Sequence, residues 1–319
     1  MNLHDVPVLV TGGSGFVGGH IAAWLAREGA QVRAVVRQPG NHPGLDSPRI
    51  TQVAGCFTDP VTAQRACEGQ RYIFHAAATV GKDMAEALAV NGDGTSVMAA
   101  AALADGCARF FHISTLSVYN FQSGRTAFTE DSPRREVGKT YPHTPAASPH
   151  YGTAKAEAER RLEVEMARGL PATIFRLGAV LGMHPTSAWG MKVPAKVKQG
   201  LVPIRGDGSD FMPWTHIENV VHAFAIALDC PESIGRVYNV VDGEVAWRDF
   251  IGEMHSWFPD APPLPVLPAE KTDTASAFIG HCPADRLRSE LGYAPLRAYA
   301  EGMAEAGAWW RKNQGKPSS

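Results

Sequence analysis

A tyrosine and a lysine four residues apart are the pair in this chain best suited to acid–base chemistry. Tyr151 and Lys155 open a helical segment that runs to about Arg168, and side chains four residues apart share one face of a helix. An isolated tyrosine has a pKa of about 10, which is too high for useful proton exchange at neutral pH. Because a neighbouring ammonium favours the phenolate, we expect Lys155 to lower the pKa of Tyr151, which would then exchange a proton with a substrate oxygen.

Hydroxyl side chains form a second group of candidates. A strand expected over residues 109–113 runs into Ser114, Thr115 and Ser117. In open α/β sheets, ligands bind beyond the carboxyl ends of the strands, so these hydroxyls are expected to face the ligand. One of them could hydrogen-bond the substrate oxygen, and their spacing alone does not say which.

The glycine-rich stretch near the N-terminus predicts a strand, a phosphate-binding loop and a helix. The apolar residues 8–10 precede Thr11-Gly12-Gly13-Ser14-Gly15-Phe16-Val17-Gly18, and residues 17–27 follow as a helix. Glycines allow a tight turn, and a diphosphate can approach the amides of a helix N-terminus. Two registers fit, Gly12-x-x-Gly15-x-x-Gly18 and Gly13-x-Gly15-x-x-Gly18. We expect a dinucleotide to contact Gly12, Ser14, Gly15, Phe16 and Val17.

The second expected strand indicates which dinucleotide binds. Residues 31–37 alternate in the manner of a strand and end on Arg37, with no carboxylate at that point. In Rossmann proteins an acidic residue there binds the ribose of NAD, whereas an arginine accommodates the 2′-phosphate of NADP. We therefore expect NADP in preference to NAD, with Arg33 as a second candidate cation. A solvent-exposed charge at a strand end is the alternative interpretation of Arg37.

Alternating strands and helices continue along the chain. Strands are expected over residues 50–54 and 72–76, with a helix over 60–67 between them. The small residues Ala76, Ala77 and Ala78 would let a cofactor lie close to the backbone, and Thr79 is a candidate substrate contact. A long helical stretch over residues 82–105 is interrupted at 91–95. Asn91 in that interruption is either a cofactor contact or part of a plain break between two helices.

Composition and charge exclude several classes of function. The chain has 319 residues, 45% of them hydrophobic, and a formal net charge of -2 without a run of basic residues, which argues against nucleic acid and anionic membranes as partners. Neither a signal peptide nor a membrane span of about 18 apolar residues is expected. The five cysteines are scattered, so no disulfides are expected, and the histidines lack a metal-binding spacing, so no metal site is expected. We expect a cytoplasmic enzyme acting on a small molecule.

These motifs together resemble the short-chain dehydrogenase/reductase superfamily in its extended branch, which includes the NAD-dependent epimerases and dehydratases. The resemblance is carried by the glycine turn, the Asn91-Gly92-Asp93-Gly94-Thr95 segment, the hydroxyls after residue 113 and the Tyr151/Lys155 pair, and it covers nearly the whole chain. Residues 32–37 are similar to dihydroflavonol reductase-like enzymes, and residues 218–223 to 3β-hydroxysteroid dehydrogenase-like enzymes.

The resemblance implies a fold and residue roles. It implies an α/β fold with a Rossmann-type doubly wound parallel sheet, formed by residues 1–182 and 214–246, and a smaller, mostly helical lid domain for the substrate, formed by residues 183–213 and 247–319. Thr115, Tyr151 and Lys155 would be catalytic, and Tyr151 and Lys155 would also contact the cofactor. Leu177 and Val180 would lie near the nicotinamide, Trp189, Trp214 and Ser117 near the substrate, and a homodimer is conceivable.

Two departures from the family pattern affect these expectations. Cys56 stands where an acidic residue usually holds the adenine, so how this chain holds the adenine is open. Residues 206–214 lack the arginine that nucleotide-sugar enzymes generally carry there. We therefore expect an NADP-dependent ketone or aldehyde reductase, or alcohol dehydrogenase, acting on an apolar small molecule. A nucleotide-sugar epimerase or dehydratase that recycles its cofactor is the alternative, and a non-catalytic NADP-binding module is a third hypothesis.

Overall fold

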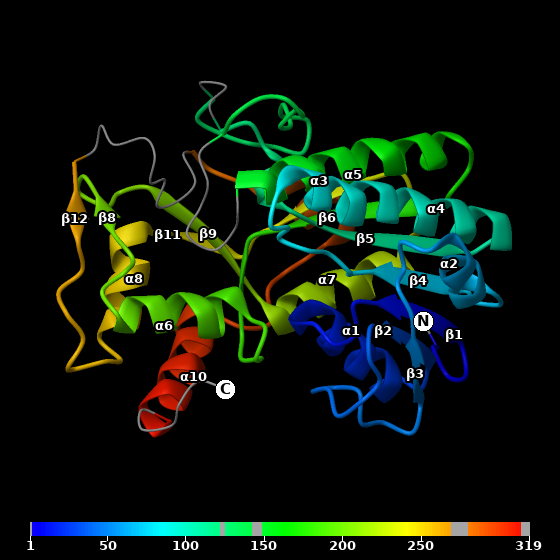
Figure 1. The fold of residues 1–319 in the computed structure, drawn as a ribbon, viewed down its shortest axis with the longest axis horizontal. Helices are drawn as coiled ribbons and strands as arrows, with labels where there is room; N and C mark the ends of the chain where they lie inside the picture. The colour runs from blue at the N-terminus through cyan, green and yellow to red at the C-terminus, as the bar shows by residue number, and fades with distance from the viewer. Residues whose placement is uncertain (1, 122–124, 142–148, 269–279, 314–319) are drawn as a thin grey trace.

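A parallel sheet of seven strands forms the centre of the molecule in the computed structural model, which describes residues 2–121, 125–141, 149–268 and 280–313 (Figure 1). The strand order is β10-β6-β5-β4-β1-β2-β3, so the chain winds outward in both directions from β1 and β4. This confirms the expected Rossmann-type sheet, whose ligand edge lies where the winding reverses. The strands are β1 (Pro7–Thr11), β2 (Gln31–Val36), β3 (Ile50–Ala54), β4 (Tyr72–His75), β5 (Arg109–Thr115), β6 (Ala172–Leu177) and β10 (Val237–Val240).

Helices cover both faces of this sheet, which explains why its strands are apolar on both sides (Figure 1). One face is covered by α2 (Pro60–Cys67), α4 (Gly94–Asp105) and α5 (Pro149–Ala167), and the other by α1 (Phe16–Arg27) and α7 (Ile217–Asp229). Neighbouring residues of a strand point to opposite faces: Leu9 belongs to the core under α2, α4 and α5, while Val8 and Val10 belong to the core on the other face.

The structure differs from the expected elements at two places that matter for the site. Residues 82–105 are not one interrupted helix but α3 (Met84–Ala87), a π-helical turn over Leu88–Asp93 and α4. The helix expected from residue 214 begins at Ile217, because residues 214–216 complete strand β9 (Phe211–His216) and His216 caps the helix by accepting a hydrogen bond from the Glu218 amide at 3.2 Å.

A second, smaller sheet joins the central sheet to the remaining helices. It has the order β11-β9-β7, with β7 (Ala179–Leu181) and β11 (Gly243–Ala246) on either side of β9. Gly178 separates β6 from β7, and a Cβ at this position would lie 2.8 Å from the carbonyl oxygen of Pro213. Only glycine therefore lets the chain pass this closely from one sheet into the other.

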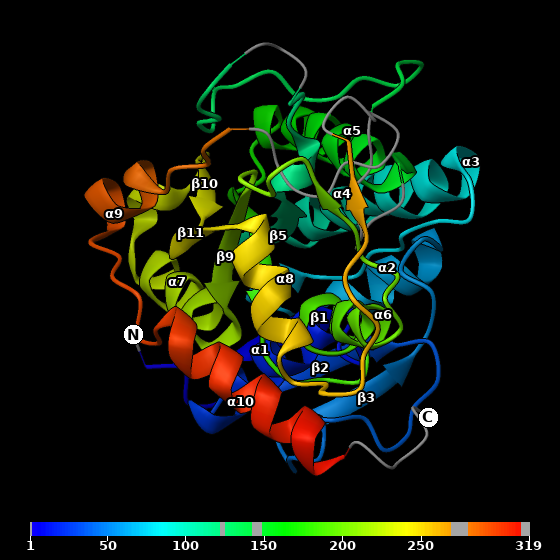
Figure 2. The ribbon, with the colours of Figure 1, turned by 90° about the vertical axis from the view of Figure 1, so that its left-hand side faces the viewer.

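The lid elements pack together on one side of the molecule (Figure 2). Their helices are the π-helical turn Ala188–Lys192, α6 (Val193–Lys198), α8 (Trp247–His255) and α10 (Tyr299–Lys312), and their strands β8 (Ile204–Arg205) and β12 (Val266–Leu267) form a short pair. Helix α9 (Asp285–Leu291), which the sequence also assigned to the lid, instead packs against β10 of the central sheet. Short 3-10 turns at Leu116–Val118 and Pro231–Ser233 complete the structure. The division into two domains remains a proposal, and β9 crosses its expected boundary. Over the described ranges, no helix is both long and apolar enough to span a bilayer.

Candidate active site

The glycine turn between β1 and α1 leaves the N-terminus of α1 open to a ligand. Gly12 has a positive φ of 70°, and a Cβ there would lie 2.8 Å from the backbone of Ala77. At Gly18 a Cβ would lie 2.2 Å from the Gly12 carbonyl oxygen, so the helix can approach the turn only without a side chain. Gly15 is the N-cap and provides no capping side chain. The first-turn amides, which lack partners within the helix, are thus suited to a diphosphate.

One of these amides is held by a residue that the sequence did not single out. The Phe16 amide donates a hydrogen bond to Thr186 Oγ1 at 3.0 Å. The ring of His184 stacks on the ring of Phe16, with centroids 5.8 Å apart and planes at 25°. The segment after β7 therefore reaches the glycine turn. Because the two residues are 170 positions apart, no local pattern in the sequence predicts this contact. Ser14 and Val17 lie beside it and are partly exposed.

The two arginines of the second strand have different surroundings. Arg37 follows β2, is exposed, and forms no hydrogen bond or ion pair within the described part of the chain. Its role toward a 2′-phosphate stays a prediction. Arg33 instead donates to the carbonyl oxygens of residues 65, 66 and 68, at 2.8–3.0 Å, at the C-terminal end of α2. The expectation that Arg33 is a second cofactor cation is wrong, because its guanidinium is used to cap a helix.

The adenine end of the expected site has the substitution noted in the sequence. Cys56 lies just beyond β3 and is exposed, and its thiol lies 3.0 Å from the hydroxyl of Thr58. The thiol and the hydroxyl can exchange one hydrogen bond with each other. The structure therefore offers Thr58 as a polar neighbour at the place where a carboxylate is usual.

Asn91 acts on the loop after β4. It is buried, and its side chain accepts from the Thr79 amide and donates to the Thr79 carbonyl oxygen, both at 2.9 Å. This pair of bonds fixes the backbone that follows Ala76, Ala77 and Ala78, three residues that are partly or fully exposed beside the glycine turn. The interruption of the helix at residues 91–95 thus has a structural reason, since its π-helical turn aims Asn91 at the loop. Direct contact of Asn91 with a cofactor stays a prediction.

Tyr151 and Lys155 lie in the first turns of α5, next to the end of β5. Gly152, between them, packs so closely on the turn after β5 that a Cβ would lie 2.2 Å from the Ser117 carbonyl oxygen. This contact brings Tyr151 beside the segment that carries Thr115, whose Oγ1 accepts a hydrogen bond from the Ser117 amide at 3.2 Å. The Tyr151 hydroxyl has no hydrogen-bond partner among the described residues, and Ser114 is instead bonded to Glu159 at 2.5 Å.

The amine of Lys155 does not point to Tyr151. Its Nζ donates to the Ile113 carbonyl oxygen at 2.8 Å and lies 3.1 Å from His112 Nε2. Burial lowers the pKa of Lys155 to about 8, partly opposed by Glu159, and burial raises the pKa of Tyr151 to about 12. The expectation that Lys155 lowers the pKa of Tyr151 is thus wrong for the protein without cofactor, because desolvation of the phenol is not offset by any neighbouring charge.

The remaining candidates lie at the same edge of the sheet or in the lid. Leu177 is the last residue of β6, at the carboxyl end of the central sheet, and Val180 lies beyond it in β7. Ser117 is buried after β5. Trp189 packs its ring on Phe250 with centroids 5.6 Å apart, and Trp214 packs on Tyr299 at 5.2 Å. Packing accounts for both tryptophans, and their contact with a substrate stays a prediction.

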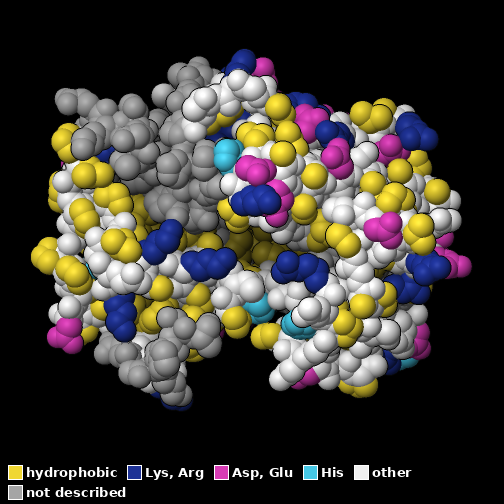
Figure 3. Space-filling view, viewed as in Figure 1, with side chains coloured by type: hydrophobic (Ala, Val, Ile, Leu, Met, Phe, Trp, Pro, Cys, Tyr) yellow, Lys and Arg dark blue, Asp and Glu magenta, His cyan; other side chains and the backbone are white. Residues whose placement is uncertain are grey.

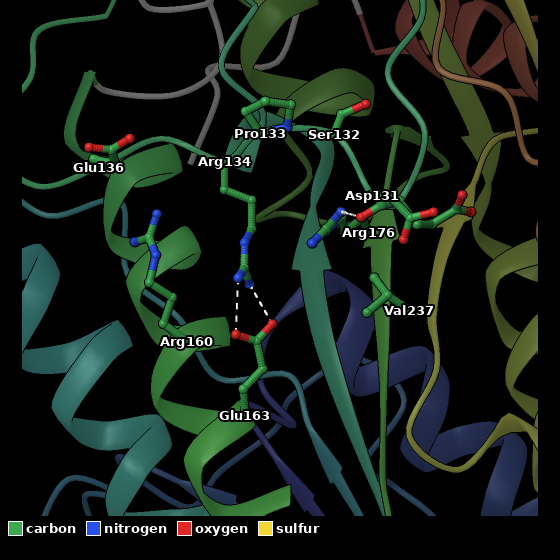
Figure 4. A pocket seen from close by; sticks show the side chains of 10 residues that line it. Asp131, Ser132, Pro133, Arg134, Glu136, Arg160, Glu163, Arg176 and Val237 are labelled. Atoms are coloured by element: carbon green, nitrogen blue, oxygen red, sulfur yellow. Dashed lines mark hydrogen bonds and ion pairs between the residues drawn. The ribbon is translucent and has the colours of Figure 1, made fainter. Parts of the chain in front are cut away.

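A charged hollow beside α5 has a structural role (Figure 4). Arg134 binds Glu163 (Figure 4). Arg134 also binds Glu159, and the buried Arg176 binds Glu159 at 2.7 Å, so these cations are already paired. Arg176 also donates to Tyr119 at 2.9 Å. The network ties α5 to β5 and β6 and so fixes the helix that carries Tyr151 and Lys155. Neither of these two residues lines the hollow.

A second hollow separates the two halves of the face drawn in Figure 3, with hydrophobic side chains at its floor and lysine or arginine side chains on its rims. In the lid segment 204–214, the guanidinium of Arg205 is 2.9 Å from the carboxylate of Asp210, and Met212 is buried. Over the described ranges, no three His, Cys, Asp or Glu side chains are grouped to hold a metal ion.

Comparison with known proteins agrees with this architecture. Residues 8–241 match the model of the NAD dependent epimerase/dehydratase family. The chain belongs to that family.

Its relatives include nucleotide-sugar enzymes and reductases. A dTDP-glucose 4,6-dehydratase of Streptomyces antibioticus is 28% identical over 96% of this chain and 93% of its own length. A 2-alkyl-3-oxoalkanoate reductase of Stenotrophomonas maltophilia strain K279a is 27% identical over 85% of this chain and 78% of its own. The structure of a dTDP-glucose 4,6-dehydratase from Streptomyces venezuelae, with NAD and TYD bound, superposes with a TM-score of 0.79 at 23% identity, over 98% of this chain and all of the other.

These findings confirm the resemblance to the extended short-chain dehydrogenases/reductases, and the chain is an NAD(P)-dependent enzyme of that type. They favour the nucleotide-sugar alternative over the net reductase that we expected from the sequence, because the dehydratase relatives cover more of the chain than the reductase does. An NADP preference is not established by them, since the solved dehydratase structure was obtained with NAD.

Proposed function

We propose that this enzyme removes a hydride from a hydroxyl-bearing carbon of a nucleotide sugar and returns it to the same molecule, so that its NAD(P) is recycled. An epimerase returns the hydride to the same carbon, whereas a dehydratase eliminates water and returns the hydride to another carbon, which leaves a keto product. The observation that carries the proposal is the placement of Tyr151 and Lys155 on α5, packed through Gly152 against the turn after Thr115. These groups lie at the sheet edge that also carries the glycine turn. The similarity to dehydratases over nearly the full chain supports the substrate class.

The residues have distinct roles in this proposal. Tyr151 accepts the proton of the substrate hydroxyl as the carbon loses its hydride, and in the epimerase reaction it returns the proton to that oxygen when the same carbon is reduced again. Thr115 keeps a hydroxyl hydrogen free to donate to the same oxygen, because its Oγ1 serves as an acceptor toward Ser117. A nicotinamide held at the glycine turn would supply hydride transfer and, in its oxidised form, a positive charge. Lys155 binds the nicotinamide ribose. Its charge, together with that of the oxidised nicotinamide, favours the phenolate of Tyr151, which burial alone disfavours.

A net carbonyl reductase or alcohol dehydrogenase is the second candidate, and the lid segment favours it. Arg205 is neutralised by Asp210, and Met212 is buried where nucleotide-sugar enzymes generally place an arginine. This wall offers little positive charge to a substrate diphosphate, although Lys192 on the neighbouring lid turn is exposed and could supply some. The similarity to a 2-alkyl-3-oxoalkanoate reductase also supports a net reductase.

The finer cofactor choice also belongs to the proposal. Arg37 is exposed and has no partner in the part of the chain that the structure describes, so it is available to bind the 2′-phosphate of NADP, and this favours NADP over NAD. A homodimer and a cytoplasmic location are proposed from the resemblance and the composition alone.

One product analysis separates the two candidates. Purified enzyme is incubated with dTDP-glucose, UDP-glucose and a panel of ketones and aldehydes, with NAD(H) or NADP(H), while products and the reduced-cofactor absorbance are followed. The proposal expects an epimer or 4-keto product with no net change in absorbance. Stoichiometric loss of the absorbance with a ketone would establish the reductase instead. Tyr151→Phe should lose about 100-fold or more of kcat in either case, while cofactor affinity stays within a few fold.

A further inference from the structure

A row of polar side chains crosses the central sheet beneath α4 and α5. Thr11 on β1, His75 on β4 and His112 on β5 are aligned in register, with Thr11 opposite His75 and His75 opposite His112. All three are fully buried. Buried polar groups are costly unless they are hydrogen-bonded, so each needs an account.

His75 is fully satisfied. Its Nδ1 lies 2.8 Å from Thr11 Oγ1 and its Nε2 lies 3.1 Å from Thr95 Oγ1. Burial lowers the pKa of His75 to about 3, so the ring is neutral. Its role is to support the next ring in the row, because the rings of His75 and His112 stack with centroids 5.6 Å apart.

His112 differs, because only one of its ring nitrogens has a hydrogen-bond partner among the described residues, and that partner is Lys155. Nε2 is 3.1 Å from Lys155 Nζ, and Nδ1 is buried and has no hydrogen-bond partner within the described ranges. An ammonium only donates hydrogen bonds, so Nε2 must be the acceptor and the ring proton must sit on Nδ1. Burial and the charge of Lys155 both lower the pKa of His112, which keeps it neutral.

The other groups around Lys155 do not replace this contact. The Ile113 carbonyl oxygen accepts a second hydrogen bond from Nζ. Glu159, on the same helix, raises the pKa of Lys155 through its charge but is bound to Arg176. His75, on β4, lowers the pKa of His112. Tyr151 forms no hydrogen bond to Nζ. His112 is therefore the one side chain, among the described residues, that accepts a hydrogen bond from this buried ammonium.

We propose that His112 is a positioning residue for Lys155: its neutral Nε2 holds the ammonium at the end of β5, charged and aimed at the cofactor ribose. This inference rests on the proposed role of Lys155. Without the acceptor, the buried amine would lose part of its stabilisation as a cation and would be free to adopt other rotamers.

The test compares two substitutions at one position. His112→Phe keeps a ring that can stack on His75 but removes the acceptor, whereas His112→Gln keeps an acceptor at a similar distance from the backbone. The titration of Lys155 is followed through its ¹³Cε resonance in the protein without cofactor, with Lys155→Met for assignment, and cofactor affinity is measured by calorimetry. We expect the Lys155 midpoint of His112→Phe to fall by about one pH unit and its cofactor Kd to rise about tenfold. The midpoint and Kd of His112→Gln should stay near those of the wild type.

Equal Lys155 midpoints in the wild type and a folded His112→Phe variant would overturn the proposal. If His112→Phe does not fold, the wild type still decides: ¹⁵N spectra must show the proton of His112 on Nδ1, and a proton on Nε2 would refute the acceptor role. Because neither readout needs a substrate, failure of every nucleotide sugar and ketone to react would count against the proposed function and leave the test of His112 intact.

Discussion

At the scale of single residues, two arginines of similar position in the sequence have different surroundings in the fold. Arg33 and Arg37 are both cations of the second strand, but Arg33 caps α2 and Arg37 is exposed and unpaired in the described structure. The difference follows from strand geometry. Arg33 lies inside β2, beside the end of α2, whereas Arg37 lies beyond the last paired residue of the strand.

Arg37→Ala tests the cofactor preference. We expect the Kd of NADPH to rise about 10- to 100-fold, since a hydrogen bond to a charged group contributes roughly 1.5–3 kcal/mol, and the Kd of NADH to change little because it lacks the 2′-phosphate. Both affinities are measured by fluorescence titration. Arg33→Ala is the matched control: it should lower the stability of the protein and leave the ratio of the two affinities unchanged. Equal losses for NADPH and NADH in Arg37→Ala would contradict the NADP preference.

At the scale of elements, the contact between α5 and the turn after β5 brings together the residues proposed to be catalytic. The helix is fixed from two sides: the Glu159 network ties its middle to β5 and β6, and Gly152 seats its first turn on Ser117. Since Tyr151 and Lys155 flank Gly152, a small shift of this turn would move both relative to Thr115.

Gly152→Ala should separate the catalytic groups. The added Cβ would meet the Ser117 carbonyl oxygen at 2.2 Å, so helix or turn must move, and we expect a loss of about 1–3 kcal/mol of unfolding free energy together with a fall in kcat of at least tenfold. Denaturant unfolding and turnover are measured on the same preparation. Gly252→Ala in α8 is the control, because a Cβ there has open space around it and should stabilise the helix by up to about 1 kcal/mol. Unchanged kcat in Gly152→Ala would show that this seating does not govern catalysis.

At the scale of the whole molecule, close contacts of individual residues connect the central sheet and α1 with the small sheet and the segment that follows it. Gly178 leads from β6 into the small sheet, and Thr186 brings the segment after β7 back to the first turn of α1. A ligand bound at the glycine turn would therefore touch parts of both the nucleotide-binding and the lid segments. We expect cofactor binding to stabilise the molecule as a whole.

Cofactor at about 100 times its Kd should raise the melting temperature by about 5 °C or more, since such saturation adds about 2.7 kcal/mol. The shift is measured by differential scanning fluorimetry. Gly18→Ala should abolish most of it, because its Cβ would lie 2.2 Å from the Gly12 carbonyl oxygen and deform the turn. Gly252→Ala should retain the full shift. A Gly18→Ala variant stabilised as much as the wild type would place the cofactor elsewhere.

Local patterns in the sequence were sufficient for many of the elements and for the two central motifs. The strand at residues 50–54 and the helix at 60–67 have the expected bounds, because the signals that begin and end such elements act within a few residues. In the structure, Asp59 caps the helix by accepting a hydrogen bond from the Thr62 amide. The glycine turn and the Tyr151/Lys155 spacing are likewise short-range, since one turn or one helix face contains all their members.

Only the tertiary structure decided where the functional atoms point. The Lys155 amine contacts His112, 43 positions earlier, and the Phe16 amide contacts Thr186, 170 positions later, so no local window contains either pair. The direction of the Tyr151 pKa shift also depended on burial, which is set by every element that packs around the helix. The sequence by itself determined which residues could do the chemistry. Packing determined which polar groups each of them meets, because hydrogen bonds and desolvation act over a few ångströms of space, whatever the separation along the chain.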